Sequence, residues 1–280
     1  AKSCVRLRFP TFTPAIGSLV PSNPLYPSVF GETERSDARY IHNPPAPRER
    51  QPKMSEPIGF GPKTKKFLRA LGRNNDKAWF DSNRREYEAY YLAPAKAFVE
   101  AVGPKLEKLS PNIVWEPRVN GSIFRVNRDI RFSKDKTPYK DHIDMWFWEG
   151  QRKTAVSGYF VRITSNSVHL GAGSHGFSRE ALASYRKAVQ DEASAKSLAS
   201  VAKRLERAGY ALGGKTYKKP PRGFSGNAAA EELVLHSALW AGVDRKSPPE
   251  MASAKFVTYC MKEWRKMAPL HRWLIDHVRA

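Results

Sequence analysis

The chain has 280 residues and a net charge of +21 at pH 7, because 48 Lys and Arg residues stand against 27 Asp and Glu residues. An apolar content of 41% excludes disorder along the whole chain, and no apolar run approaches the roughly 18 residues that a membrane span needs. The two cysteines, Cys4 and Cys260, form neither a disulfide framework nor a metal-ligand spacing. These observations predict a cytoplasmic protein without membrane contact, whose charge attracts polyanions and phosphorylated ligands.

The first 53 residues differ in composition from the rest of the chain. They hold nine of the 21 prolines and have no helix or strand periodicity over a useful window. We interpret residues 1–53 as a disordered extension; the alternatives are an upstream read-through ahead of Met54 and a transit peptide, which the acid-free first 31 residues would suit. Residues 54–280 hold 40 Lys and Arg against 23 Asp and Glu, so their charge is +17.

The segment from Gly59 to about Leu109 has the period of amphipathic helices. Apolar residues recur at helical spacing between residues 64 and 71. Asp76 is a candidate N-cap for a second helix, and Pro94 fits the first turn of a third. The sequence therefore predicts three N-terminal helices.

After Pro111 the apolar period changes to two, which predicts strands at 121–132, 143–148, 155–163 and 168–172. Short connections between these strands favour antiparallel pairing. Ser178 is a candidate N-cap, and helical patterns return at about 193–208, 228–240 and 250–278. Residues 54–280 are thus predicted to form a single α+β domain, in which N-terminal and C-terminal helices pack on a central antiparallel sheet.

The run from Arg125 to Lys140 carries more charge than a structural strand needs. Read at period two, Arg125, Asp129 and Arg131 share one face, while Arg128 falls among apolar residues on the other face. A guanidinium on an apolar face needs a carboxylate partner or a bound anion. The run therefore predicts a cationic site on a strand and the loop that follows it.

We expect this site to bind a ligand through Arg and Lys side chains, which hold phosphate and carboxylate groups well. Asp129, ionised among arginines, is the candidate catalytic residue, because it could position a hydroxyl or accept a proton. The alternative is an Arg–Asp network that only supports the fold. The predicted ligand-binding residues are Arg125, Arg128, Arg131, Lys134, Lys136, Tyr139, Lys140 and, from a basic loop over residues 215–224, Arg222.

Other motifs carry less information. The stretch Gly171–Gly176 fits G-x-G-x-x-G, but the strands before it look antiparallel, which argues against a dinucleotide-binding unit. The seven histidines have no zinc-binding spacing, so that no metal site is predicted. Trp146 and Trp148 share a strand face and would form either an aromatic floor or ordinary sheet packing. No motif identifies a cofactor.

Several of these segments together resemble one family. They are the helical pattern around Phe67, Asn74-Asn75 and Trp79-Phe80, the run from Arg125 to Lys140, the glycine-containing strand end at Gly171, and the loop Lys219–Phe224. In this combination the chain resembles the bacterial conserved family known as domain of unknown function 2461, from about residue 59 to residue 275. The family has a glycine triplet where this chain has Gly171-Ala-Gly173. The resemblance implies the extent of the folded unit and no particular chemistry.

Three classes of function agree with the sequence. The first is an enzyme or binding protein for a small phosphorylated or carboxylated ligand, which the concentration of cations in one segment favours. The second is a nucleic-acid-binding protein that uses the broad basic surface; we expect its binding to be weak and non-specific. The third is a structural or interaction domain. The sequence does not indicate the oligomeric state.

Overall fold

The computed structural model describes residues 59–152, 154 and 156–279, which belong to one compact unit; the predicted extension over residues 1–53 lies outside the described residues. Its N-terminal part is helical, with α1 at Pro62–Arg73, α2 at Lys77–Ser82, α3 at Arg84–Tyr87 and α4 at Ala93–Glu107, and a π-helical turn, η1, at Glu88–Leu92. The Asp76 carboxylate caps α2 by accepting a hydrogen bond from the backbone N–H of Trp79 at 2.8 Å, which confirms the predicted N-cap. The second predicted helix is thus divided between α2, α3 and η1.

The centre of the unit is a six-stranded sheet in the order β1-β2-β3-β4-β6-β5, and every neighbouring pair is antiparallel. The strands are β1 at Ile113–Val114, β2 at Ile143–Glu149, β3 at Gly158–Ile163, β4 at Ser167–Ser174, β5 at Ala211–Lys215 and β6 at His236–Lys246. The predicted α+β class with a central antiparallel sheet is confirmed.

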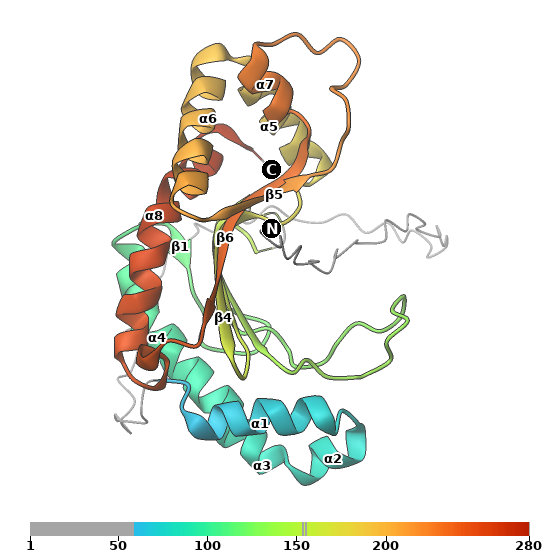
Figure 1. Ribbon diagram of the computed structural model, residues 1–280, viewed down its shortest axis with the longest axis vertical. Helices are drawn as coiled ribbons and strands as arrows, with labels where there is room; N and C mark the ends of the chain where they lie inside the picture. Colours follow the sequence, from blue (N-terminus) through green and yellow to red (C-terminus); the bar gives the residue numbers. More distant parts are fainter. Residues whose placement is uncertain (1–58, 153, 155, 280) are drawn as a thin grey trace, which may run out of the picture. The chain divides into compact units, whose positions relative to one another are not determined.

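The C-terminal part supplies α5 at Arg179–Gln190, α6 at Glu192–Arg207, α7 at Ala228–Leu233, a 3₁₀ turn, η2, at Pro249–Ala252, and α8 at Lys255–His277. Ser178 caps α5 as predicted, because its hydroxyl accepts a hydrogen bond from the backbone N–H of Ala181. Helix α8, with α4 beside it, covers one face of the sheet (Figure 1). In the described part of the chain, no helix is long and apolar enough to cross a membrane.

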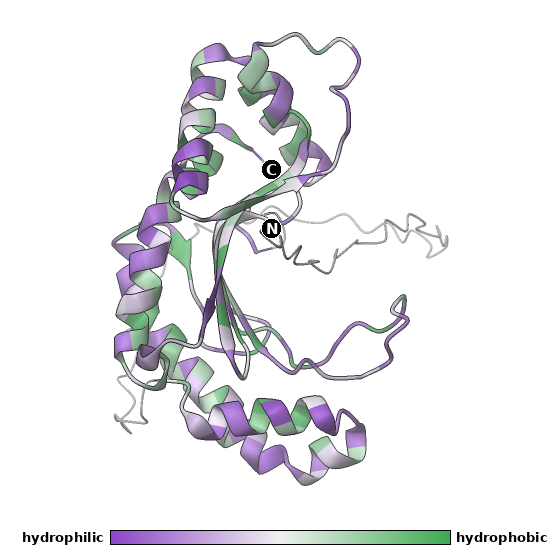
Figure 2. Ribbon diagram, viewed as in Figure 1, coloured by the Kyte–Doolittle hydropathy of each residue, from purple (hydrophilic) through white to green (hydrophobic). Residues whose placement is uncertain are grey.

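The core lies between the sheet and α8. Phe147 on β2 and Tyr159 on β3 are buried against Trp264 of α8, with ring centroids 5.6 and 5.8 Å from the Trp264 ring. The Trp264 indole donates to the backbone oxygen of Phe160, so its polar atom is satisfied inside the core. The strands mix hydrophobic and hydrophilic residues in Figure 2, whereas the long loops over residues 127–137 and 216–227 are mostly hydrophilic.

Two predicted elements are wrong. Residues 121–132 form no strand: they make only isolated bridges, at Ile123 and Asn127, and Phe132 is 82% exposed instead of packed. Backbone bonds from Arg128 N–H to Pro138 and from Lys140 N–H to Val126 join the two arms of a long loop instead. The helix predicted at 228–240 ends at Leu233, and β6 follows it.

Strands β5 and β6 were not predicted, for different reasons. β6 lies between β4 and β5 and is buried at most of its positions, so its apolar residues do not alternate cleanly with polar ones. β5 is short and contains Gly213 and Gly214, which have low strand propensity. Its backbone pairing with β6 holds it in the sheet.

Candidate functional site

The face of the sheet opposite α8 carries polar and aromatic side chains in cross-strand rows. The register aligns four polar residues across β2, β3, β4 and β6: Asp144, Arg162, His169 and Asp244. The next row along the strands contains Trp146, Phe160, Gly171 and Gly242, and the third contains Trp148, Gly158, Gly173 and Trp240. A sheet face with ionisable groups in one row and aromatic rings beside them differs from the packed face, which is almost wholly apolar.

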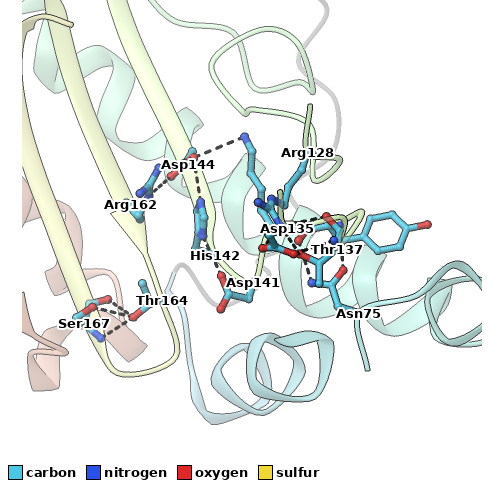
Figure 3. Close-up of polar contacts among 12 residues, drawn as sticks. Asn75, Arg128, Asp135, Thr137, Asp141, His142, Asp144, Arg162, Thr164 and Ser167 are labelled. Carbon is cyan, nitrogen blue, oxygen red and sulfur yellow. Dashed lines mark hydrogen bonds and ion pairs between the residues drawn. The ribbon is translucent and has the colours of Figure 1, made fainter. Parts of the chain in front are cut away.

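Asp144 is the centre of the polar row, and only 5% of its side chain is exposed. Arg162 donates to both of its oxygens, at 2.7 Å from Nε and 3.1 Å from Nη2. His142 Nε2 lies 3.3 Å from Asp144 Oδ2, and Lys140 Nζ lies 3.6 Å from the same atom. The second nitrogen of His142, Nδ1, lies 3.0 Å from Asp141 Oδ1, so that the ring is held between two carboxylates (Figure 3).

The ionisation of this cluster follows from burial and from these contacts. Burial acts to raise the pKa of Asp144, but the hydrogen bonds from His142 and Arg162 outweigh it and hold that pKa well below its usual value. The pKa of Lys140 is lowered, chiefly by burial; Asp144 acts against that change, while the charges of Arg162 and Arg125 add to it. For His142, burial acts to lower the pKa, and hydrogen bonds to Asp141 and Asp144 leave it raised. Arg125 and Arg162 therefore each lie close enough to Lys140 to repel its charge.

Aromatic rings surround these cations. Lys140 Nζ lies 5.0 Å from the centre of the Phe124 ring, and the Arg152 guanidinium lies 5.5 Å from it. Arg152 also lies over the stacked rings of Trp146 and Trp148, at 5.8 and 5.4 Å. Its Nε is buried and has no hydrogen-bond partner within the described part of the chain. The predicted aromatic floor at Trp146 and Trp148 is thus the base under a guanidinium.

The predicted residues of the long loop mostly bind one another. Arg128 donates to Asp135, at 2.5 Å, and to both the backbone oxygen and the hydroxyl of Thr137. Arg131 makes two bonds to the carboxylate of Asp129, at 2.9 and 2.7 Å, and both side chains are largely exposed. These contacts lower the pKa of Asp129 to about 2. An exposed carboxylate with so low a pKa is a weak proton acceptor near neutral pH, so the geometry does not favour the predicted catalytic role.

The other predicted residues lie in three different environments. Lys136 Nζ donates to the backbone oxygen of Ile130 within the loop, and Lys134 is exposed. The Tyr139 ring is buried and stacks on Phe80, with centroids 4.2 Å apart, so it anchors the loop by packing. The Asn75 side chain fixes the same residue by accepting from its backbone N–H and donating to its backbone oxygen, each at 2.9 Å.

Arg222 does not join this group. The loop over residues 216–227 leaves the sheet beside α5 and α7, at the opposite end of the sheet from the loop over residues 127–137 (Figure 1). The fold therefore does not bring Arg222 together with the predicted ligand-binding residues of the loop over residues 127–137. Of the predicted ligand-binding residues, the structure brings Lys140 to Asp144 on the polar face of the sheet, and Arg125 lies near enough for its charge to act on Lys140.

The sequence analysis did not indicate Arg162 as a site residue. One signal was available: the strands are apolar at most other positions, but are interrupted by Asp144, Arg162 and His169, which antiparallel pairing places side by side. Finding them required the register, which the sequence alone did not fix. Among the described residues, no three His, Cys, Asp or Glu side chains are grouped closely enough to hold a metal ion.

A small sheet-centred α+β unit with an ionic row on its open face is a general class of architecture that hosts many activities. The family comparison is more specific: residues 63–273 match the model of a family described as conserved hypothetical protein (DUF2461). The chain belongs to this family. Comparisons with curated proteins and with solved structures gave no match.

Proposed function

We propose that the protein binds a small ligand with a phosphate or carboxylate group on the polar face of the sheet, between Lys140, Arg162 and Arg125. The observation that carries the proposal is a charge imbalance around Asp144. Lys140 and Arg162 both contact this one buried carboxylate, while Asp141 and Asp244 act on Arg162 only at longer range. Two partly buried cations against one carboxylate leave positive charge that an anion from solution would neutralise.

The remaining donors of the site support this proposal. Arg162 uses Nε and Nη2 for Asp144, so that Nη1 is free to donate, and 43% of its side chain is exposed. Arg125 is exposed and forms no ion pair within the described residues, and neither does Arg152. Guanidinium groups bind carboxylate and phosphate in a planar, two-point geometry. The rings of Phe124 and Phe160, near these cations, would exclude water from the bound anion.

Co-purification of metabolites tests the proposal. The full chain and its Lys140→Met/Arg162→Met variant would be purified in parallel, and the small molecules that each carries would be identified by mass spectrometry. We expect the wild-type protein to retain a phosphorylated or carboxylated metabolite that the variant lacks. Lys134→Met, on the same loop but exposed, is the control and should retain it. Equal retention by all three proteins would contradict the proposal.

A second candidate function, binding of nucleic acid, is favoured by a different observation. A groove of about 530 Å³ between α6 and α7 is lined by Lys196, Lys203, Arg204, Arg207, Ala199, Ser200 and Ala229. Of its four cations, only Lys196 forms an ion pair within the described residues, and that partner is the exposed Glu192. A concave basic surface without acidic lining suits a phosphate backbone.

A further inference from the structure

His169 lies on the same open face as Arg162, and one of its two ring nitrogens is fixed by a carboxylate. The strand register places His169 between Arg162 on β3 and Asp244 on β6. His169 Nδ1 lies 3.0 Å from Asp244 Oδ1. A carboxylate in this position selects the tautomer in which Nδ1 carries the proton, which leaves Nε2 as an acceptor.

Two glycines determine where Nε2 lies. A Cβ atom at Gly242 would come within 2.9 Å of His169 Cε1 and 3.0 Å of Nε2, and a Cβ atom at Gly171 would lie 3.5 Å from Nε2. The imidazole therefore lies over glycine backbone, and its Nε2 edge faces the row that contains Phe160.

The surroundings of His169 supply the other groups of a proton-transfer site. The Phe160 ring centroid lies 6.0 Å from the imidazole, and His175 stacks on Trp240 beside them, with centroids 5.4 Å apart. The charged and titratable groups that face His169 are Arg162, Asp244 and His175. Asp244 stabilises an imidazolium, and Arg162 stabilises negative charge on a ligand.

We propose that His169 is the general base of the anion site and that Asp244 is its positioning residue. The substrate would be a small phosphate- or carboxylate-bearing molecule with an ionisable O–H group next to the anion. In the step, the O–H bond breaks and its proton moves to His169 Nε2. The electron pair stays on the ligand oxygen, whose charge faces the Arg162 guanidinium, and the imidazolium pairs with Asp244. This inference rests on the proposed function, because Arg162 must hold the ligand.

Histidine NMR on the full chain, with inorganic phosphate as the probe, tests the inference. Long-range proton–nitrogen spectra report the tautomer of each imidazole directly. We expect the Nδ1–H tautomer at His169 and a change in its Nε2 resonance as phosphate is added. Asp244→Asn should abolish the tautomer preference without weakening phosphate binding, since it removes a negative charge from the surroundings of the anion. Arg162→Met should weaken phosphate binding about tenfold or more.

Controls separate this inference from the proposed function. Gly242→Ala should displace the His169 ring and remove its response to phosphate, whereas Gly176→Ala, where an added Cβ meets nothing within 4 Å, should keep the response. If phosphate binds through Arg162 but the His169 resonances do not move, or if His169 has the Nε2–H tautomer, the general-base role is wrong and the anion site stands. If phosphate does not bind to the wild-type protein, both proposals are overturned.

Discussion

Asp144 is the residue on which the polar face depends. Asp144→Asn keeps the shape of the side chain but removes the only carboxylate that Lys140 and Arg162 contact in the described part of the chain. Breaking a fully buried ion pair costs roughly 3–5 kcal/mol, and since 43% of Arg162 is exposed we expect a loss of about 2–3 kcal/mol in the free energy of unfolding. Urea denaturation at pH 7 measures this loss of stability. Asp129→Asn, which removes an exposed ion pair, should change stability little.

The same residue gives a prediction for acid. The pKa of Asp144 is lowered in the folded state, because the hydrogen bonds from His142 and Arg162 outweigh burial. A lowered pKa contributes stability above the unfolded value of about 4, and this contribution is lost as pH falls through the folded pKa. Below about pH 5, His142 is protonated in both states. The stability difference between wild type and Asp144→Asn should therefore be constant from pH 5 to about 4 and shrink below it. A difference that grows in acid would contradict this assignment.

At the scale of elements, the glycines at the end of β4 have different structural tasks. Gly173 has φ +123°, and a Cβ atom there would lie 2.3 Å from the backbone oxygen of Leu239 on β6. Gly173→Ala should therefore separate β4 from β6 and lower the free energy of unfolding by about 1–3 kcal/mol. Gly176→Ala is the matched control, because the space around it is open. Thermal unfolding compares the two variants. If both have the same melting temperature, the end of β4 does not have the close backbone approach to β6 described here.

The attachment of the long loop is a second element with a testable contact. Asn75 bonds both backbone groups of Tyr139, whereas its neighbour Asn74 bonds only the backbone oxygen of Ala70 in its own helix. Asn75→Ala leaves two backbone groups without partners, so amide hydrogen exchange over residues 127–140 should become faster. Asn74→Ala should leave exchange in this loop unchanged. If both variants exchange alike, the Tyr139–Phe80 stack alone holds the loop.

The sequence predicted those elements whose local signals agree with their tertiary role. The caps at Asp76 and Ser178 and the strands β2, β3 and β4 have such signals, and they are found in the structure. Segment 121–132 has a period of two, but it touches β2 only around Ser122 and Phe124, and beyond them its backbone bonds to residues 138 and 140 within the same loop. The pairing of Arg162 with Asp144 comes from register, which depends on contacts between strands and not on local propensity.

At the scale of the molecule, the +17 charge of residues 54–280 makes some binding of DNA at low salt inevitable. Whether that binding is a function of the protein must therefore be decided by which surface binds DNA and by how steeply the affinity falls with salt. The α6–α7 groove and the polar face of the sheet are separate surfaces, and variants can be matched between them. Lys203→Ala/Arg207→Ala should weaken DNA binding and leave phosphate binding intact, whereas Lys140→Met/Arg162→Met should do the reverse. Fluorescence anisotropy with a DNA duplex and calorimetry with phosphate measure the two activities.

The salt dependence distinguishes a specific role for nucleic acid from charge alone. Release of counterions lowers log affinity by about 0.9 per phosphate contact for each tenfold rise in salt, so three contacts predict a loss of about 40-fold between 50 and 200 mM. Inorganic phosphate carries no condensed counterions, so its binding at the polar face should depend far less on salt than duplex binding does. We expect duplex binding to be sequence-indifferent and largely absent at physiological ionic strength. Tight duplex binding that persists there and falls equally in both double variants would mean that the polar face itself holds nucleic acid, because two independent surfaces would not respond alike.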